Sequence, residues 1–324
     1  MHNLAFQGLF PADLYPQLGV PGNSLLPDGL EFYGKISFLK AGISYSDRLT
    51  TVSRTYAREI LTAEYGFGLE GLLQRRAEDL VGILNGADYR IWDPSTDTNL
   101  PANFNLQNIA GKQACKTALQ AELGLEVDSE AALIVLVSRI TEQKMADVVA
   151  AALPRIIESG AHCALVGDGD RDLEERFALA ARRHLGRIAV HIGYDERLAH
   201  RVMASGDILL HPARFEPCGL TQLYGMRYGT LPVVRSTGGL RDTVVAATDR
   251  SIRRGMATGF VFESANALDI LHCIEGALAL YRRPLLWRKV QRHAMAQDFG
   301  WSDSARRYLA LHRDLAPQPI AIAD

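Results

Sequence analysis

Short apolar runs alternate with amphipathic segments along most of the chain after residue 130. The apolar runs predict buried strands at residues 133–137, 163–166, 188–192, 208–211 and 231–234. The segments between them have apolar residues at three- and four-residue spacing, which predicts helices at residues 147–157, 171–184 and 196–203, and others that begin near 220 and 239. Strands that alternate with amphipathic helices are typical of a doubly wound parallel sheet, so we predict an α/β fold.

The first 94 residues follow a different pattern, with shorter periodic segments and more Gly and Pro. A helix is expected at residues 55–61 with Ser53 or Thr55 as its cap. The one fully apolar strand candidate is residues 80–84, which ends at the turn pair Asn85-Gly86. A parallel sheet of one or two strands leaves open edges and an uncovered face, so we predict that this part is half a domain.

No periodic pattern is visible between residues 93 and 107, where Asp, Pro, Ser, Thr and Asn predominate, and we place the interdomain linker there. Later in the chain, Ser264 is the expected cap of a helix, Pro284 ends that helix or starts the next, and residues 301–311 form a last amphipathic helix. With 324 residues, two cores are expected rather than one. The expected parts are residues 1–94, 95–300 and 301–324.

Composition and charge narrow the choice of ligand. A formal net charge of −2 provides no long-range field for nucleic acid or an anionic membrane, so we expect a small ligand held by local cations. No run approaches the ~20 apolar residues of a membrane span, and the amino terminus lacks the regions of a signal peptide, which predicts a cytosolic protein. The four cysteines form no Cys-x-x-Cys pair and no His/Asp/Glu cluster has ligand spacing, so reduced thiols and no metal are expected.

Residues 214–222 contain most of the candidate chemistry, because they follow the strand at 208–211 and open a helix near Leu220. Pro217 cannot donate to a sheet, Gly219 allows close approach of the backbone, and the first turn of a helix leaves its N–H groups free to bind an anion. Glu216 is better placed to accept hydrogen bonds from hydroxyls than to bind phosphate. A sugar attached to a diphosphate fits both halves.

The stretch that contains Glu216-Pro217-Cys218-Gly219, with residues 222–232 and 237–240 after it, resembles the bacterial glycogen synthase and plant starch synthase family. The resemblance recurs in the right order at residues 2–8, 29–32, 35–42, 83–86 and 138–144, and covers residues 2 to about 312. It implies a retaining glucosyltransferase of the two-domain GT-B fold. The expected architecture is a complete carboxyl-terminal Rossmann-like domain, an incomplete amino-terminal one, and a final helix that crosses back to the latter.

The resemblance also assigns roles to single residues. Glu216 is expected to contact the glucose hydroxyls and to support positive charge at the anomeric carbon, and His2 to reach the 6-hydroxyl. Arg139 and Lys144 follow a buried strand and are expected to stabilise the leaving diphosphate. The substrate site would further include Asn85 at the sugar, Tyr194 against the adenine, Cys218 as pocket wall, the N–H groups of Gly219, Leu220 and Thr221 at the distal phosphate, and Thr237, Gly238 and Gly239 beside the sugar.

Spacing alone leaves plainer alternatives open. Arg139 and Lys144 are equally compatible with solvated surface charges, and Glu216 with a partner of the helix dipole. Cys218 is more often a small buried filler than a nucleophile, and Tyr194 at a strand end is most often a packing residue.

Two features depart from the family pattern. The family usually has Gly after the lysine, whereas this chain has Met145, which puts the local backbone path in question. The family also opens with a Lys-x-Gly-Gly loop, and none occurs here. We therefore expect that the chain lacks on the order of 150 residues of a domain, that His2 frays, and that the open edges promote self-association.

The predicted function is transfer of glucose, with retention, from ADP-glucose to the non-reducing end of an α-1,4-glucan such as glycogen, with no cofactor. The choice of ADP rests on the resemblance to the bacterial branch. The alternative is a catalytically inactive fragment that only binds ADP, ADP-glucose or glucan, and the chain by itself is expected to have no measurable synthase activity. A pyridoxal-phosphate glucan phosphorylase would need a cofactor-lysine region that the sequence does not contain.

Overall fold

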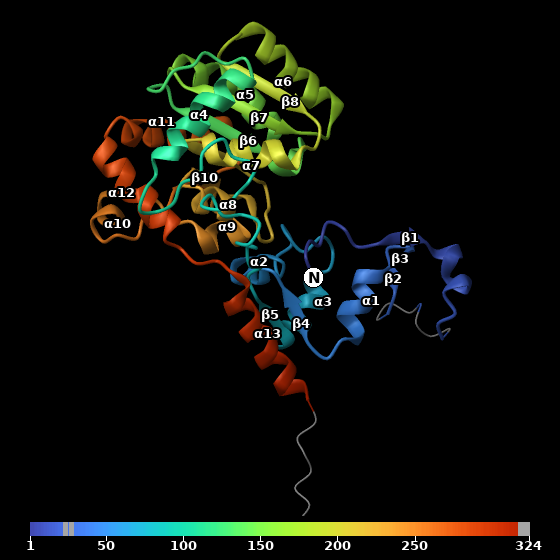
Figure 1. Cartoon of the computed structure of the whole chain (residues 1–324). Helices are drawn as coiled ribbons and strands as arrows, with labels where there is room; N and C mark the ends of the chain where they lie inside the picture. Colours follow the sequence, from blue (N-terminus) through green and yellow to red (C-terminus); the bar gives the residue numbers. More distant parts are fainter. Residues whose placement is uncertain (22–24, 26–28, 317–324) are drawn as a thin grey trace, which may run out of the picture. The chain divides into compact units, whose positions relative to one another are not determined.

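The computed structural model describes residues 1–21, 25 and 29–316, which form two compact units. Unit 1 comprises Met1–Gly86 and Phe299–Asp324, and unit 2 comprises Ala87–Asp298. Figure 1 traces both units along the chain. Among the described residues, no helix combines the length and apolar character needed to cross a membrane.

Unit 2 is built on a six-stranded parallel sheet with the strand order β11-β10-β9-β6-β7-β8. All five predicted strands are present, and β11 is an additional short edge strand. The bounds are β6 (Leu133–Val137), β7 (His162–Gly167), β8 (Ile188–Ile192), β9 (Ile208–His211), β10 (Leu231–Arg235) and β11 (Phe260–Phe262).

Helices cover both faces of this sheet. On one face, α5, which follows β6, packs between α11 and α6. On the other face, α7, which follows β8, packs against α4 and α8, because right-handed crossovers in opposite directions place helices on opposite faces. The helices are α4 (Ala110–Glu122), α5 (Ala146–Glu158), α6 (Arg171–Arg183), α7 (Glu196–Ser205), α8 (Thr221–Arg227), α9 (Gly238–Thr243), α10 (Asp249–Arg253), α11 (Ala267–Tyr281) and α12 (Pro284–Met295).

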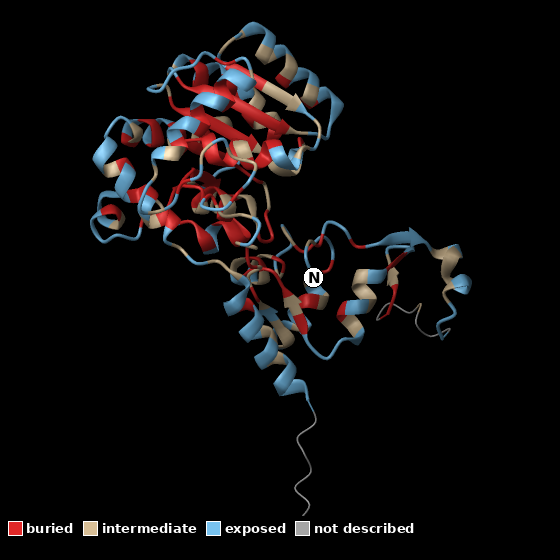
Figure 2. Cartoon of the chain, in the orientation of Figure 1, coloured by how far each residue is buried: buried red, intermediate tan, exposed pale blue. Residues whose placement is uncertain are grey.

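The central strands lie in the middle of the core, as the red ribbons of Figure 2 show. Leu133, Ile134 and Val135 of β6 and Ile208 and Leu209 of β9 are fully buried. Residues on both faces of a doubly covered sheet are shielded from water, so such strands read as continuous apolar runs rather than as alternating ones. This is why the sequence pattern located them.

Unit 1 has less regular structure. Its strands form a three-stranded antiparallel sheet in the order β1-β3-β2 and a separate parallel pair of β4 and β5. A small core gathers Leu4, Ile43, Tyr56 and Leu73. The elements are β1 (Leu9–Pro11), β2 (Glu31–Phe32), β3 (Lys35–Ser37), α1 (Phe38–Tyr45), β4 (Leu49–Thr51), α2 (Arg54–Glu59), α3 (Glu70–Arg75), β5 (Leu80–Gly82) and α13 (Trp301–Leu315).

Helix α13 closes one side of unit 1. The Ser304 hydroxyl donates to the carbonyl oxygen of Leu84, just after β5. A Cβ atom on Gly86 would lie 2.6 Å from the backbone of Trp301, so only glycine permits this approach. The part of the expected terminal segment beyond residue 316 lies outside the described residues.

The placement of the linker at residues 93–107 is wrong, because this segment belongs to unit 2 and the division falls between Gly86 and Ala87. Phe104 is 3% exposed within the core. Asp97 is buried and accepts hydrogen bonds from Tyr228 Oη and pairs with His200 Nδ1, both at 2.6 Å. The segment looked like a linker because its order comes from side-chain anchors rather than from a periodic pattern.

Helix α4 was not predicted, and its buried face explains why. That face includes Lys112, Lys116 and Gln120, which disrupt the apolar stripe expected of a core-facing helix.

The predicted cap Ser264 is wrong, because α11 begins after Asn266, whose side chain accepts a hydrogen bond from the Asp269 N–H. Of the two cap candidates for α2, the structure uses Ser53, and Pro284 starts α12.

Candidate active site

The predicted site residues of unit 2 follow five neighbouring strands at the same edge of the sheet. Because the strands are parallel, the loops after β10, β9, β6, β7 and β8 all emerge at their carboxyl ends in that spatial order. The chain runs from β6 outward through β7 to β8 and then returns to the other side of β6 with β9, so the strand order reverses between β6 and β9. Open α/β sheets bind ligands at such a switch point.

Lys144 and Glu216 meet at this switch point. Lys144 lies in a 3-10 turn (Glu142–Lys144) after β6, and its Nζ forms an ion pair with Oε2 of Glu216 from the loop after β9. The two side chains are 13% and 9% exposed. Sequence spacing placed both residues at the sheet edge, and the structure shows that they share one contact.

The carboxylate of Glu216 is kept ionised despite its burial. Burial by itself raises the pKa of Glu216, but the charge of Lys144 and the hydrogen bonds from Lys144 and the Gly219 backbone N–H bring the pKa below its ordinary value. The Gly219 N–H, predicted as a phosphate donor, therefore serves the Glu216 carboxylate in this structure. Leu220 and Thr221 remain at the opening of α8, where the first N–H groups of a helix lack intrahelical partners.

A third side chain, His211, lies beside this pair and was not predicted. His211 ends β9 and is 2% exposed, and its Nε2 lies 3.7 Å from Glu216 Oε2. Burial, assisted by the positive charge of Lys144, lowers the pKa of His211 to about 3, so the ring is neutral near pH 7. The sequence contained one signal that could have indicated His211: it is a polar residue at the end of an apolar strand, five positions before Glu216.

Hydrogen bonds hold the loops after β6 and β9 together. Arg214 binds both carboxylate oxygens of Asp147 at 2.8 and 2.7 Å, and its backbone N–H donates to the Gln143 carbonyl at 2.8 Å. Gln143 returns a side-chain hydrogen bond to the carbonyl of Phe215 at 3.2 Å. Contacts on both sides of the Lys144–Glu216 pair thus fix the spacing between the two loops.

The loop after β10 forms the other wall. Its Gly239 N–H donates to the Glu216 carbonyl at 3.0 Å, and a Cβ atom on Gly239 would overlap the carbonyl of Cys218. Gly238 has a φ of 44°, in the left-handed region that favours glycine, and Thr237 is fully buried. The structure thereby brings Cys218, Thr237, Gly238 and Gly239 next to Glu216.

Arg139 and Tyr194 lie in a separate pocket of about 240 Å³ beside β6, β7 and β8. Tyr194 is 82% exposed as a residue, so it is available for stacking rather than for core packing. Arg139 contacts Gln143 through Nη2 at 3.4 Å. Lys144 therefore pairs with Glu216, while Arg139 lines the pocket of Tyr194 and contacts Gln143, the residue before Lys144.

His2 and Asn85 belong to unit 1. The start of the chain is anchored rather than frayed, because the amino group of Met1 donates to the Thr50 carbonyl at 2.6 Å and the Thr51 hydroxyl donates to the Met1 carbonyl at 3.1 Å. The His2 side chain is exposed, and Asn85 is half-buried after β5.

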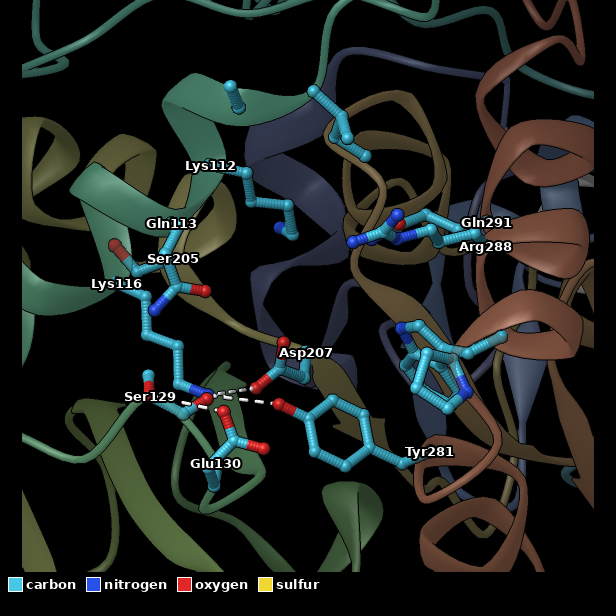
Figure 3. A pocket seen from close by; sticks show the side chains of 14 residues that line it. Lys112, Gln113, Lys116, Ser129, Glu130, Ser205, Asp207, Tyr281, Arg288 and Gln291 are labelled. Atoms are coloured by element: carbon cyan, nitrogen blue, oxygen red, sulfur yellow. Dashed lines mark hydrogen bonds and ion pairs between the residues drawn. The ribbon is translucent and has the colours of Figure 1, made fainter.

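A second cavity, of about 300 Å³, opens at the opposite edge of the sheet and is shown in Figure 3. Lys116 points there toward Asp207 and Tyr281, at 2.8 and 3.1 Å. Lys112 Nζ donates to Thr230 Oγ1 at 2.8 Å and to the carbonyls of Ala204 and Tyr228. Because these two buried lysines are already committed to protein acceptors, the cavity is a poorer anion site than the switch point.

Comparisons with known proteins identify the family of this chain. The chain is 49% identical over 318 residues to a glycogen synthase of Serratia proteamaculans, with 98% of this chain and 67% of that protein covered. The chain belongs to the glycogen synthase family. It is also 51% identical over 315 residues to a glycogen synthase of Paramagnetospirillum magneticum, and the chain spans about two thirds of the length of these relatives.

Family models and solved structures extend the match. Residues 1–75 match a model described as starch synthase catalytic domain, and residues 131–279 match one described as glycosyl transferases group 1. The catalytic domain of starch synthase IV from Arabidopsis thaliana, bound to ADP and acarbose, superimposes with a TM-score of 0.92 at 34% identity, over 97% of this chain and 65% of that one. The predicted GT-B glycosyltransferase fold is confirmed.

Met145 stands where the glycogen synthase family usually has glycine after the lysine, and it adopts a conformation that favours glycine. Met145 has a φ of 52° and a ψ of 31°, in the left-handed region, and its side chain is fully buried. Met145 lies between Lys144 and the first residue of α5, so its conformation sets the direction from which Lys144 approaches Glu216.

We predict that Met145→Gly destabilises the chain. Glycine relieves a left-handed strain of ~1–2 kcal/mol. Removing a buried methionine side chain costs ~2–5 kcal/mol, and the added backbone freedom costs ~0.5–1 kcal/mol more. Packing therefore outweighs strain, and we expect a net loss of ~0.5–5 kcal/mol in the free energy of unfolding, measured by urea denaturation.

Met145→Leu is the matched control, because it keeps the volume and the strain and should cost less than ~1.5 kcal/mol. A glycine variant more stable than the wild-type chain would contradict this balance of packing and strain.

Proposed function

We propose that unit 2 binds the ADP part of ADP-glucose and that the chain takes part in transfer of glucose, with retention, to the non-reducing end of an α-1,4-glucan such as glycogen. The observation that carries this proposal is the Lys144–Glu216 pair, which places one cation and one carboxylate together at the switch point between β6 and β9. The starch synthase IV structure that resembles this chain contains ADP and acarbose, a nucleotide and a sugar ligand.

The chemistry follows from where charge develops. When the bond between the anomeric carbon and the diphosphate breaks, negative charge accumulates on the diphosphate and positive charge on the sugar. We assign Lys144 and Arg139 to the diphosphate, where cations stabilise the leaving group without a cofactor. Glu216 lies 7% exposed, where poor solvation strengthens its attraction for the positive charge on the sugar.

The remaining residues would position the donor. Tyr194, highly exposed beside a pocket of about 240 Å³, is assigned to stack on the adenine. Leu220 and Thr221, at the opening of α8, are assigned to the distal phosphate. We keep Cys218, Thr237, Gly238 and Gly239 as the wall beside the sugar, and His2 and Asn85 as sugar contacts from unit 1.

Replacing Lys144 by Ala should weaken binding of ADP. The variant loses a charge-assisted contact of ~1.5–3 kcal/mol, which corresponds to a ~10- to 150-fold increase in Kd. Isothermal titration calorimetry of the chain with ADP measures this change, and thermal unfolding of the same samples establishes that the variant is folded.

Lys289→Ala is the matched control, because Lys289 is an exposed lysine on α12 and its loss should leave Kd unchanged. Equal Kd values for the wild-type chain and Lys144→Ala would overturn the assignment of the diphosphate site.

Glu216→Ala should separate binding from chemistry. This carboxylate acts on charge that exists mainly in the transition state, so we expect a fall in kcat of at least ~10²-fold. The affinity for ADP should stay the same or rise, because Lys144 loses its competing partner. The assay follows transfer of labelled glucose from ADP-glucose to glycogen, by the chain alone and with the amino-terminal segment of a glycogen synthase relative supplied in trans.

Equal losses in kcat and in ADP affinity would show that Glu216 is only a binding group. ADP binding with no transfer under either condition would favour the alternative, a chain that binds nucleotide or glucan without catalysis.

We further propose that unit 1 associates with a second copy through its parallel strand pair. Among the described residues, β4 and β5 pair only with each other, and Val81 in β5 is 38% exposed. An open strand edge with an exposed apolar residue favours edge-to-edge pairing, and an inserted lysine opposes such pairing.

Val81→Lys should therefore shift the chain toward monomer in sedimentation-velocity experiments. Val127→Lys, at an exposed valine of unit 2, should cause no such shift. A monomeric wild-type chain would contradict this.

A further inference from the structure

One buried polar atom beside the Glu216 carboxylate has no hydrogen-bond partner among the described residues. It is Nε2 of His211, which is enclosed by protein and lies 3.7 Å from Glu216 Oε2. A buried donor or acceptor without a hydrogen bond is costly, so each such atom calls for a physical reason. The proposed function assigns no role to this one.

His211 is held in place, whereas its neighbours can adjust. Its backbone is paired with Val234 of β10 inside the sheet. Lys144 reaches Glu216 on a long flexible side chain from a turn, and Glu216 itself lies in a loop whose backbone carbonyl is fixed by Gly239. A shift of the Glu216 carboxylate by under ~1 Å would bring Oε2 to normal hydrogen-bond distance from Nε2.

Lys144 is assigned two partners that compete for it. In the structure its ammonium group pairs with Glu216 Oε2. The proposed function requires the same ammonium group at the diphosphate, and each approach of Lys144 to phosphate weakens its hold on Glu216. A carboxylate only 7% exposed that loses its cation acquires a raised pKa and takes up a proton, which would end its role at the sugar.

We propose that Glu216 exchanges partners when a nucleoside diphosphate binds: Lys144 Nζ moves from Glu216 Oε2 to the phosphate, and the Nε2–H of neutral His211 donates to that oxygen instead. His211 is then a positioning residue, which keeps Glu216 ionised and correctly aimed while the cation serves the leaving group. This inference rests on the proposed function, because it takes Lys144 as the phosphate ligand.

The surroundings leave few other groups for this task. Lys144 and His211 are the titratable groups that act on Glu216, together with the Gly219 backbone N–H, and Lys144 and Glu216 are those that act on His211. A neutral imidazole donates one hydrogen bond at fixed geometry and carries no charge that would compete for the phosphate. A second lysine at this position would bind the anion itself.

The test is the number of protons taken up when ADP binds. The chain is titrated with ADP by calorimetry at pH 7 in buffers that differ in ionisation enthalpy. In His211→Leu, Glu216 loses its second donor, so we expect ADP binding to take up between about 0.5 and 1 proton more than in the wild-type chain, with a ~10-fold weaker Kd. His211→Gln retains an N–H donor and should restore the wild-type proton number.

A double variant, His211→Leu with Glu216→Gln, provides the control. It lacks the group that would be protonated, so its proton uptake should match that of Glu216→Gln alone. The proton release of ADP itself cancels in each difference. If His211→Leu does not fold, His211→Met also removes the donor and the same comparison applies.

The outcomes separate the two proposals. If ADP fails to bind the wild-type chain, or binds Lys144→Ala equally well, the proposed function fails. If ADP binding depends on Lys144, but His211→Leu and the wild-type chain take up equal numbers of protons with equal Kd, the partner exchange is overturned and the proposed function stands.

Discussion

The site depends on keeping one buried carboxylate charged. Glu216 is almost completely removed from water, and burial alone would raise its pKa. The ammonium group of Lys144 and the N–H of Gly219 supply the compensation, and each comes from a different segment. The loops after β6 and β9 must therefore keep a constant separation. Two sets of hydrogen bonds maintain this separation. Arg214 binds both carboxylate oxygens of Asp147, and Gln143 is hydrogen-bonded to the backbone of residues 214 and 215.

The parallel sheet makes this convergence possible. Lys144 and Glu216 are 72 residues apart in sequence, yet the strands that precede them are neighbours in the sheet. In a parallel sheet every loop at the carboxyl edge faces the same side, so residues after β10, β9, β6, β7 and β8 form one continuous row. The reversal of strand order between β6 and β9 separates the two connecting helices and leaves room at that point for a ligand. The pocket of Tyr194 continues the row toward β8.

Backbone conformation at this edge is maintained at some cost. Gly219, Gly238 and Met145 all have positive φ angles, and only Met145 carries a side chain. Its burial at the start of α5 shows how a non-glycine residue persists in a left-handed conformation: packing stabilises the side chain by more than the strain destabilises the backbone. The turn that presents Lys144 therefore depends on the packing of the Met145 side chain as well as on its backbone.

Periodicity located the strands of unit 2 because a sheet covered on both faces requires continuous apolar runs. The periodic pattern missed α4 because Lys112 and Lys116 of that helix face inward. There, backbone carbonyls, Thr230 and Tyr281 accept hydrogen bonds from the two ammonium groups, and Asp207 forms an ion pair with Lys116. Residues 93–107 looked like a linker for the same reason, because a periodic pattern does not record long-range side-chain contacts. Phe104 and Asp97 anchor that segment to unit 2 through contacts with residues about a hundred positions away, which no local pattern encodes.

The amino-acid sequence by itself determined the fold class, the family, and which residues gather at the carboxyl edge of the sheet, since strand order along the chain and motif identity are local properties. Only the tertiary structure decided that Lys144 pairs with Glu216, that Arg139 lies instead with Tyr194, that Gly219 donates to a carboxylate, and that His211 presents an unpartnered nitrogen to the same oxygen. These facts depend on distances of a few ångströms between side chains from different strands. Such distances follow from the packing of the whole unit, and spacing along the chain contains no measure of them.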